Sequence, residues 1–413
     1  MKKESFYNHH IVFNGEKRIY NGATKASISL APGVDIQKIM DEDSKTTDIL
    51  EQAGIVVDDG FSEISAMEYL FNKTYFGSND FLNVVLVPGL DCNFKCPYCF
   101  ENVGKDSGFE TNLNDYFSKL KLFSKEFMLK FKNVEISMFG GEPLLYSSGF
   151  FDYFEFLKKE LPELNFFTSI VTNGSLLDIE MMNRLIRYDI RSIQVTLDGC
   201  KKAHDNSRIF KSGKPSYDLL ISNINNAVSL LPDNCEFNLR INLNNVTVSD
   251  VETTLSDIDM SIRRKIKVLF RPIYNTDCYK NSNFNKHSEL MQFYKLAIDM
   301  GYDIVRNTYY FQACESCSGD NFFFIMPDMS LWKCINDITF FDAKIGIIDE
   351  TGIPQFYANS LLKWYDYSNC FKDEKCVECK HLPDCFGGCV LYRAKNGKRA
   401  CKEFEMASLP FLF

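Results

Sequence analysis

Three cysteines in one short segment are the first residues of this chain that could do chemistry. Cys92, Cys96 and Cys99 follow an apolar run, and no further cysteine or histidine lies nearby in the sequence. A structural zinc site is usually closed by a fourth such ligand. Three thiolates that leave one metal position open suit an iron–sulfur cluster with one iron free to bind another molecule. The spacing therefore favours an iron–sulfur cluster, with a zinc ion or coincidental spacing as the alternatives.

A larger set of cysteines lies near the C-terminal end at fixed spacing. The pattern is Cys376-x2-Cys379-x5-Cys385-x3-Cys389 followed by Cys401, with Cys314, Cys317 and Cys334 upstream. The chain holds 15 cysteines, and an odd number in a reducing compartment does not indicate a disulfide framework. Metal binding explains the clustering better, either as iron–sulfur clusters or, alternatively, as zinc ribbons.

Glycines and polar residues follow three apolar segments of the central region. They are Gly140-Gly141-Glu142-Pro143, Thr172-Asn173-Gly174 and Thr196-Leu197-Asp198-Gly199, with His204-Asp205-Asn206-Ser207-Arg208 downstream. The first motif is compatible with an ordinary strand-to-helix turn, in which glycine supplies unusual dihedral angles and proline begins the helix. It also suits a ligand site, because glycine allows close approach of the backbone and a carboxylate pairs with an amine.

The segments that must position these residues alternate between strands and helices. Apolar strands are predicted at residues 82–88, 134–139, 167–172, 192–197, 236–241 and 266–270, with helical stretches between them. Several strands are apolar on both faces, which is typical of a buried parallel sheet. The pattern predicts an α/β barrel or a doubly wound sheet, and the count of six favours a partial (β/α)6 TIM-type barrel. In such barrels the chemistry takes place at the carboxyl ends of the strands.

These motifs together resemble the radical S-adenosylmethionine (SAM) superfamily. The resemblance rests on C-x3-C-x2-C at Cys92, Cys96 and Cys99, on the aromatic Tyr98, and on the Gly-Gly-Glu motif after the second strand. It implies a [4Fe–4S] cluster whose open iron binds the amino and carboxylate groups of SAM. In this family one electron from the cluster cleaves SAM, and the resulting 5′-deoxyadenosyl radical abstracts a hydrogen atom from the substrate. The resemblance also implies that the clusters degrade in air.

The same resemblance implies the residues that contact SAM. They are Gly140, Gly141, Glu142, Pro143, Asn173, Thr196, Arg208, Arg240 and Tyr98. Glu142 is expected to pair with the amino group of SAM, and Asn173 and Thr196 are expected to contact its ribose. Either Arg208, in a stretch similar to the family's H-D-x-x-R, or Arg240 is expected to meet the carboxylate. A purely structural role is the alternative for either arginine.

The C-terminal spacing resembles the SPASM extension of radical SAM enzymes and implies two auxiliary [4Fe–4S] clusters. The first is assigned to Cys314, Cys317, Cys334 and Cys389, and the second to Cys376, Cys379, Cys385 and Cys401. Without Cys314 the first auxiliary cluster would have an open iron. The family has a glycine where this chain has Met329, so the turn there is expected to change although no ligand is lost. Cys200, Cys235, Cys278 and Cys370 remain, and Cys370 is an alternate candidate ligand of the second cluster.

The chain is expected to form three parts: a small N-terminal α+β domain (1–80), a radical SAM core (81–300) and a cysteine-rich SPASM domain (301–413). The N-terminal part resembles the leader-peptide recognition domains of enzymes that modify ribosomally made peptides, in which the leader adds as a strand to a sheet edge. A cap that only packs on the rest of the chain is the alternative.

Composition limits the partners of this protein. The net charge of -9 argues against nucleic acid, because nucleic-acid-binding proteins usually present a basic face. The sequence has no apolar run of about 20 residues that would cross a membrane, and its first residues lack the apolar region of a secretion signal. A cytoplasmic location is therefore expected. The family resemblance adds an electron donor such as flavodoxin or ferredoxin.

The leading functional hypothesis is a maturase that crosslinks a ribosomally made precursor peptide, through a thioether or a carbon–carbon bond. The second is an anaerobic sulfatase maturase that makes formylglycine, but that family usually has an Asp where this chain has Ile335. The third is a non-catalytic iron–sulfur protein, which an intact Gly-Gly-Glu motif argues against. No general base follows from the sequence, and Asp198, Asp205 and Asp277 are candidates by location only.

Overall fold

The chain forms two compact units in a computed structural model that describes residues 2–13, 16–76, 80–99, 112–244, 246–273, 287–304, 319–399 and 401. The smaller unit comprises residues 1–78, 306–320 and 364–413, and the larger comprises residues 79–305 and 321–363. Of the residues named above, Cys314, Cys317, Asp277 and Cys278 lie outside the described ranges. No helix within those ranges is long and apolar enough to span a membrane.

The larger unit is built on six neighbouring parallel strands, as the sequence predicts. They are β6 (Phe81–Leu86), β7 (Asn133–Met138), β8 (Asn165–Thr172), β9 (Ile190–Leu197), β10 (Glu236–Leu243) and β11 (Ile266–Pro272), paired in that order. The short strand β12 (Asp303–Ile304) adds to β11. Leu82, Val84 and Leu86 of β6 are completely buried, as expected for a central parallel strand covered on its faces. The α/β fold class is confirmed.

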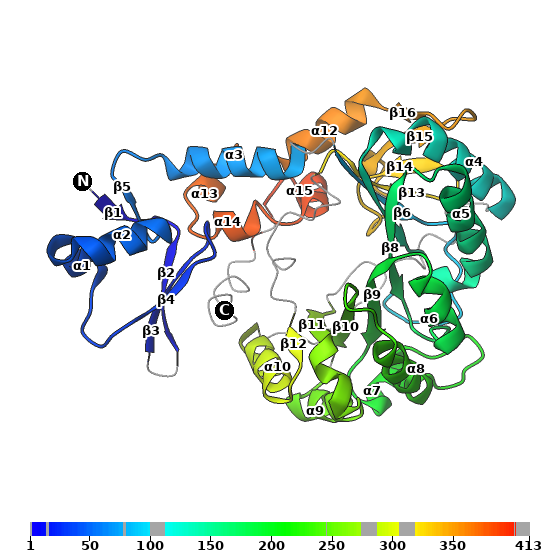
Figure 1. Cartoon of the computed structure of the whole chain (residues 1–413), viewed down its shortest axis with the longest axis horizontal. Helices are drawn as coiled ribbons and strands as arrows, with labels where there is room; N and C mark the ends of the chain where they lie inside the picture. Colours follow the sequence, from blue (N-terminus) through cyan, green and yellow to red (C-terminus); the bar gives the residue numbers. More distant parts are fainter. Residues whose placement is uncertain are drawn as a thin grey trace. The chain divides into compact units, whose positions relative to one another are not determined.

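Helices that connect the strands are placed by their apolar faces. They are α4 (Leu113–Glu126), α5 (Ser147–Glu160), α6 (Ile179–Ile186), α7 (Lys201–Ser207), α8 (Tyr217–Ser229), α9 (Val248–Ser256) and α10 (His287–Asp299), with short 3-10 turns η2 (Met128–Lys130), η3 (Pro143–Tyr146) and η4 (Met260–Lys265). In α4, Tyr116, Leu120 and Phe123 repeat at helical spacing and are buried. Figure 1 shows α4, α5, α6 and α8 along one side of strands β6–β9.

Four further strands extend the sheet beyond β6. They are β13 (Phe322–Ile325), β14 (Ser330–Trp332), β15 (Lys344–Ile348) and β16 (Pro354–Phe356), with η5 (Phe341–Ala343) between the second and third. β13 pairs in parallel with β6, and the next three strands are antiparallel. The β13–β14 turn contains Met329 with φ of 63°. Met329 therefore takes the left-handed conformation that glycine adopts easily, so the turn is retained at a cost in strain.

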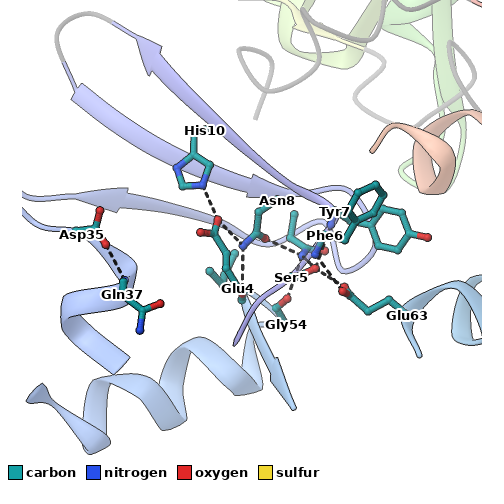
Figure 2. A network of polar contacts seen from close by, with 12 residues as sticks. Glu4, Ser5, Phe6, Tyr7, Asn8, His10, Asp35, Gln37, Gly54 and Glu63 are labelled. Carbon is teal, nitrogen blue, oxygen red and sulfur yellow. Dashed lines mark hydrogen bonds and ion pairs between the residues drawn. The ribbon is translucent and has the colours of Figure 1, made fainter. Parts of the chain in front are cut away.

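The N-terminal part of the smaller unit contains two small sheets and three helices. Strand β1 (Lys2–Glu4) pairs with β5 (Val56–Asp58), and β2 (Asn8–Phe13), β3 (Glu16–Asn21) and β4 (Ser27–Leu30) form an antiparallel sheet. The helices are α1 (Ile36–Glu42), α2 (Ser44–Gln52) and α3 (Glu63–Phe76). Figure 2 shows the polar contacts that hold the first residues: Glu63 accepts from the Ser5 hydroxyl (2.5 Å) and from the Phe6 backbone N–H (3.0 Å).

The rest of the smaller unit carries most of the C-terminal cysteines on short helices. They are α12 (Ala358–Ser368, which begins in the larger unit), α13 (Glu374–Val377), α14 (Leu382–Cys385) and α15 (Val390–Asn396). This segment shares one apolar core with the N-terminal part, formed by Tyr7, Met67, Phe71, Cys370, Cys376, Leu382 and Phe386. The ring centroids of Phe71 and Phe386 lie 5.2 Å apart. The N-terminal part and the cysteine-bearing segment therefore pack as one body.

Candidate functional site

The loop that carries Cys92, Cys96 and Cys99 is held on both of its sides. On one side the Glu142 backbone N–H donates to the Asp91 carbonyl (2.8 Å). On the other, the Phe94 and Phe210 rings pack edge to face at 4.8 Å, and the Lys95 N–H donates to the Ile209 carbonyl (3.0 Å). The loop follows β6, so its thiols lie at the carboxyl end of the sheet, where the sequence predicts the chemistry.

The three thiols of this loop differ in burial. Cys96 is 9% exposed, whereas Cys92 and Cys99 are half-buried. Burial raises the pKa of the Cys96 thiol to about 11, so this thiol keeps its proton at neutral pH until a metal displaces it. Within the described residues, no three Cys, His, Asp or Glu side chains converge on the position of a single ion. A [4Fe–4S] cluster does not require such convergence, because each cysteine binds a different iron.

Glu142 joins the loop after β7 to the loop after β8. Its carboxylate is completely buried and accepts from the Leu144 N–H (3.0 Å), the Thr172 hydroxyl (2.7 Å) and the Asn173 N–H (2.7 Å). Burial raises the pKa of Glu142, and these three donors oppose that shift. Both carboxylate oxygens therefore have protein donors, and the expected pairing of Glu142 with the amine of SAM stays a prediction.

Asn173 extends this connection to the cysteine loop. Its side-chain amide donates to Asn93 Oδ1 (2.8 Å) and lies 3.7 Å from Cys92 Sγ. The buried carboxylate of Glu142 thus fixes the backbone of a residue whose side chain contacts the first thiol. Asn173 was predicted to contact the SAM ribose, and the structure adds this contact with Cys92.

A second buried network surrounds Tyr98. The Tyr98 hydroxyl hydrogen-bonds to Asp198 and accepts from Arg208 Nη1 (3.2 Å) and Asn242 Nδ2 (3.3 Å). Asp198 also accepts from Asn242 Nδ2 (3.0 Å) and the Ser207 hydroxyl (2.6 Å). Since several donors hold this carboxylate in place, the contacts give Asp198 a positioning role, whereas the sequence offered it only as a candidate base.

Two arginines, the buried Arg208 and the half-buried Arg240, lie beside this network. Arg208 is 9% exposed, and its Nε has no hydrogen-bond partner among the described residues. Arg240, on β10 beside Thr196 of β9, donates through Nε to Asn242 Oδ1 (2.9 Å). Burial and the nearby Arg271 guanidinium lower the pKa of Arg240 to about 10. The open N–H of Arg208 makes it the better fit to the carboxylate of SAM, because a buried guanidinium seeks an anionic acceptor.

The other residues of the H-D-x-x-R stretch have structural partners. His204 is completely buried, and its Nδ1 accepts from the Asp198 N–H (3.2 Å). Burial lowers the pKa of His204 to about 3, so the ring is neutral. Asp205 accepts from the backbone N–H groups of Ser216 (2.9 Å) and Tyr217 (3.0 Å) at the start of α8. These contacts make Asp205 a helix cap, which is a role the sequence did not suggest.

The cysteines of the predicted second auxiliary cluster lie close together within the smaller unit. Cys385 interacts electrostatically with Cys376, Cys379 and Cys401. Burial raises the pKa of the Cys385 thiol to about 12 and that of Cys376 to about 11. Four neighbouring thiols are the ligand set of a [4Fe–4S] cluster, so these cysteines fit such a cluster. Of the predicted first auxiliary set, Cys334 follows β14 in the larger unit and Cys389 begins α15 in the smaller one.

Comparison with known families decides the identity of the central region. Residues 86–258 match the model of the radical SAM superfamily. The chain contains a radical SAM domain. The matched residues include the three-cysteine loop, Glu142, Asn173, Asp198, Arg208 and Asn242, which all contribute to the networks described above. This superfamily binds SAM and a [4Fe–4S] cluster, and the thiol set and the open Arg208 N–H fit both groups.

Curated relatives and solved structures extend the likeness beyond the radical SAM domain. A cysteine-type anaerobic sulfatase-maturating enzyme of Clostridium novyi is 24% identical over 342 residues, covering 74% of this chain and 87% of the relative. A structure titled native anSMEcpe with bound AdoMet matches with a TM-score of 0.60 at 19% identity, over 80% of this chain and 98% of that one. Streptococcus suis SuiB bound to its precursor peptide SuiA matches with a TM-score of 0.52 at 16% identity, over 96% of this chain and 98% of that one.

Asn242 is the functional candidate that the sequence reasoning missed. It is 3% exposed and connects Tyr98, Asp198 and Arg240. A signal was present, because Asn242 lies two residues after Arg240 and therefore on the same face of a strand, near its carboxyl end.

Proposed function

We propose that this protein is a radical SAM peptide maturase that abstracts a hydrogen atom from a ribosomally made precursor peptide and forms a thioether or carbon–carbon crosslink. The proposal rests on the share of this chain that each of two solved structures matches. The fold of SuiB, whose structure is known with a precursor peptide, matches 96% of this chain, whereas the fold of anSMEcpe matches 80%. The SuiB match therefore extends over a larger share of this chain than the anSMEcpe match does.

The chain's own residues prepare the radical SAM site for this chemistry. When bound, the cluster and SAM supply the 5′-deoxyadenosyl radical that abstracts the hydrogen. Glu142 holds the backbone of Asn173, whose side chain contacts Cys92, and Arg208 presents an N–H for the SAM carboxylate. Asp198 and Asn242 hold the hydroxyl of Tyr98, the residue directly before Cys99. Such fixed placement suits radical chemistry, which depends on positioning and on exclusion of water.

The N-terminal sheet offers the proposed place for the leader of the precursor. Its strand order is β2-β3-β4, so β2 and β4 are the outer strands. An outer strand has a row of backbone groups that can pair with an added strand. The side chains of β4 alternate between exposed and half-buried along Ser27–Leu30, as they do in a strand with one solvent-facing side. A leader peptide bound there would be tethered to the enzyme.

Two auxiliary [4Fe–4S] clusters complete the proposed enzyme. The proposed ligands are Cys314, Cys317, Cys334 and Cys389 for the first, and Cys376, Cys379, Cys385 and Cys401 for the second. Four thiolates on each would leave no open iron, which favours electron transfer to a donor or acceptor such as flavodoxin or ferredoxin.

The test is the mass of a small peptide encoded beside the gene after anaerobic co-expression with the enzyme. A crosslink removes two hydrogens from the peptide, so each crosslink lowers the mass by about 2 Da. The control is the variant in which Cys92, Cys96 and Cys99 are replaced by Ala. An unchanged peptide together with continued cleavage of SAM to 5′-deoxyadenosine would reject this substrate class and retain the radical chemistry.

The C. novyi relative supports a second candidate function, sulfatase maturation, because it matches 74% of this chain. The structure gives little support for the base of that reaction. Ile335, at the position where that family usually has an Asp, is 3% exposed and apolar. The nearby Asp337 accepts from the Thr339 N–H (3.0 Å) and hydroxyl (2.5 Å) as a turn cap. Conversion of Cys or Ser to formylglycine in a sulfatase-motif peptide would establish this function.

A further inference from the structure

A fifth cysteine lies among the thiols of the proposed second auxiliary site. Cys370 is completely buried and shares an apolar core with Cys376. The thiols of Cys376 and Cys385 interact electrostatically with that of Cys370. The spacing of the C-terminal motif has no place for Cys370, which the sequence offers only as an alternate candidate, and the fold places it in one core with Cys376.

The backbone around Cys370 is arranged for close approach to the loop between Cys385 and Cys389. Gly387 in this loop has φ of 80°, and a Cβ on it would lie 2.7 Å from the Cβ of Cys370. Only glycine permits this contact. On the other side, the Asp373 N–H donates to the Cys370 carbonyl (3.1 Å), and Asp373 caps α13, which carries Cys376. Cys370 thus lies against the Cys385–Cys389 loop and is linked through Asp373 to the start of α13.

A buried cation accompanies this thiol. Arg393 is 8% exposed, and its guanidinium donates to the carbonyl oxygens of Asn369 (2.8 Å) and Ser368 (3.4 Å), directly before Cys370. Its Nη1 would lie 2.6 Å from a Cβ on Gly387. Arg393 therefore fixes the backbone directly before Cys370 and lies against the loop that carries Gly387.

Cys401 differs from the other proposed ligands because it is exposed. Two residues earlier in the chain, Arg399 pairs with Asp373 (3.1 Å). An exposed ligand that follows a surface ion pair is held less firmly than a ligand inside a core.

We propose that Cys370 is a reserve ligand of the second auxiliary cluster and takes the fourth position when Cys401 is absent or detached. The exchange breaks one Fe–S bond and forms another. Cys370 gives up its thiol proton, Cys401 gains one, and no electron moves. The proposal rests on the proposed auxiliary cluster and is independent of which peptide or sulfatase substrate the enzyme modifies.

The test uses the full chain with Cys92, Cys96 and Cys99 replaced by Ala, so that only auxiliary clusters remain. Cys370→Ala, Cys401→Ala and the double substitution are added to this parent variant, with Cys235→Ala, another buried cysteine, as the matched control. Each protein is reconstituted anaerobically, its iron is counted, and it is then oxidised mildly. A [4Fe–4S] cluster with one iron lacking a protein ligand loses that iron and gives the electron paramagnetic resonance signal of a [3Fe–4S] cluster.

The expected result is that neither single substitution increases the [3Fe–4S] signal or lowers the iron content relative to the parent, whereas the double substitution does one or the other. Cys401→Ala behaving like the double variant would overturn the proposal, since Cys370 would then be unable to replace it. A double variant that matches the parent would also overturn it. A parent that holds no [4Fe–4S] cluster after reconstitution would remove the second auxiliary cluster and the proposal together, while leaving the maturase hypothesis to its own peptide assay.

Discussion

Replacing Gly141 by Ala should greatly lower the rate of SAM cleavage, because it displaces the loop that carries Cys92. A Cβ at position 141 would lie 2.2 Å from the Asp91 carbonyl oxygen and 2.4 Å from that of Leu90. Ordinary contacts of a Cβ begin at 3.4 Å, so the two backbones must separate by about 1.2 Å, because overpacked groups relieve a clash by shifting. Asp91 directly precedes Cys92, and the displacement therefore reaches the first thiol.

The expected loss of SAM-cleavage rate is large because the added Cβ clashes with backbone atoms, which cannot rotate away as a flexible side chain can. Overpacking of this kind costs about 1–3 kcal/mol of folding free energy, and a 1 Å misplacement of reacting groups can lower a rate about 100-fold. The Glu142 N–H would also lose its bond to the Asp91 carbonyl (2.8 Å). Gly141→Ala should therefore slow SAM cleavage by about two orders of magnitude, even when the protein remains folded.

The assay measures 5′-deoxyadenosine formed from SAM under anaerobic conditions with a strong chemical reductant, together with iron content. Gly60→Ala is the matched control, because no atom lies within 4 Å of its added Cβ and its φ is not positive. The control should cleave SAM at the wild-type rate. A Gly141→Ala enzyme with full iron content and a rate within about threefold of wild type would refute the claim that this contact positions the loop.

Other perturbations test the remaining networks. Asn242→Leu removes the hydrogen bonds that Asn242 makes with Asp198 Oδ1 and Arg240 Nε, at about 1–3 kcal/mol for each group left unsatisfied; SAM cleavage should fall while cluster absorbance persists, and an unchanged rate would exclude the positioning role. The pKa of His204 is about 3 in the fold and about 6.5 when unfolded, so its stabilisation is complete above pH 6.5 and declines as the pH falls toward 3; about 2 kcal/mol is lost by pH 5, and the drop in unfolding temperature from pH 7 to pH 5 should be smaller in His204→Gln. Asp384 is 3% exposed, accepts from the Tyr20 hydroxyl (3.0 Å) and pairs with Lys25; Asp384→Asn should speed hydrogen exchange in β3, whereas Lys38→Met, which breaks an exposed pair with Glu42, should leave it unchanged. Met329→Gly relieves about 1–2 kcal/mol of left-handed strain but removes a side chain that is 2% exposed, which costs about 2–5 kcal/mol; the unfolding temperature should fall, and a rise would show that strain dominates.

The sequence was sufficient for the six parallel strands β6–β11 of the larger unit, and it did not predict the added strands β13–β16. Each strand from β6 to β11 is an apolar run, and connection of parallel strands through helices leaves few arrangements. It also located the cysteine loop, Glu142 and Asn173 at the carboxyl ends of those strands, because local spacing and strand order fix them. Met329 is a further case: the β13–β14 turn has a residue in the left-handed conformation although that residue is not glycine.

The roles of individual side chains within the site depended on the fold. Glu142 was expected to pair with SAM, and the fold adds that its oxygens accept from Leu144, Thr172 and Asn173. Asp205 looked like a candidate base and caps α8. Such roles depend on which donors come within about 3 Å, and a sequence pattern cannot specify a distance between segments that are far apart in the chain.

The sequence by itself determined the chemistry that this protein can support: soft thiolate ligands in a fixed spacing, placed after a buried strand. Only the tertiary structure decided which groups hold those thiols in place and how Cys370 packs near the C-terminal cysteines. Asn242 lies 144 positions from Tyr98 in the sequence. Cys370 packs closely against the Cys385–Cys389 loop, because Gly387 has no side chain there. Both contacts arise because folding brings distant segments within van der Waals distance, where burial and hydrogen bonding act.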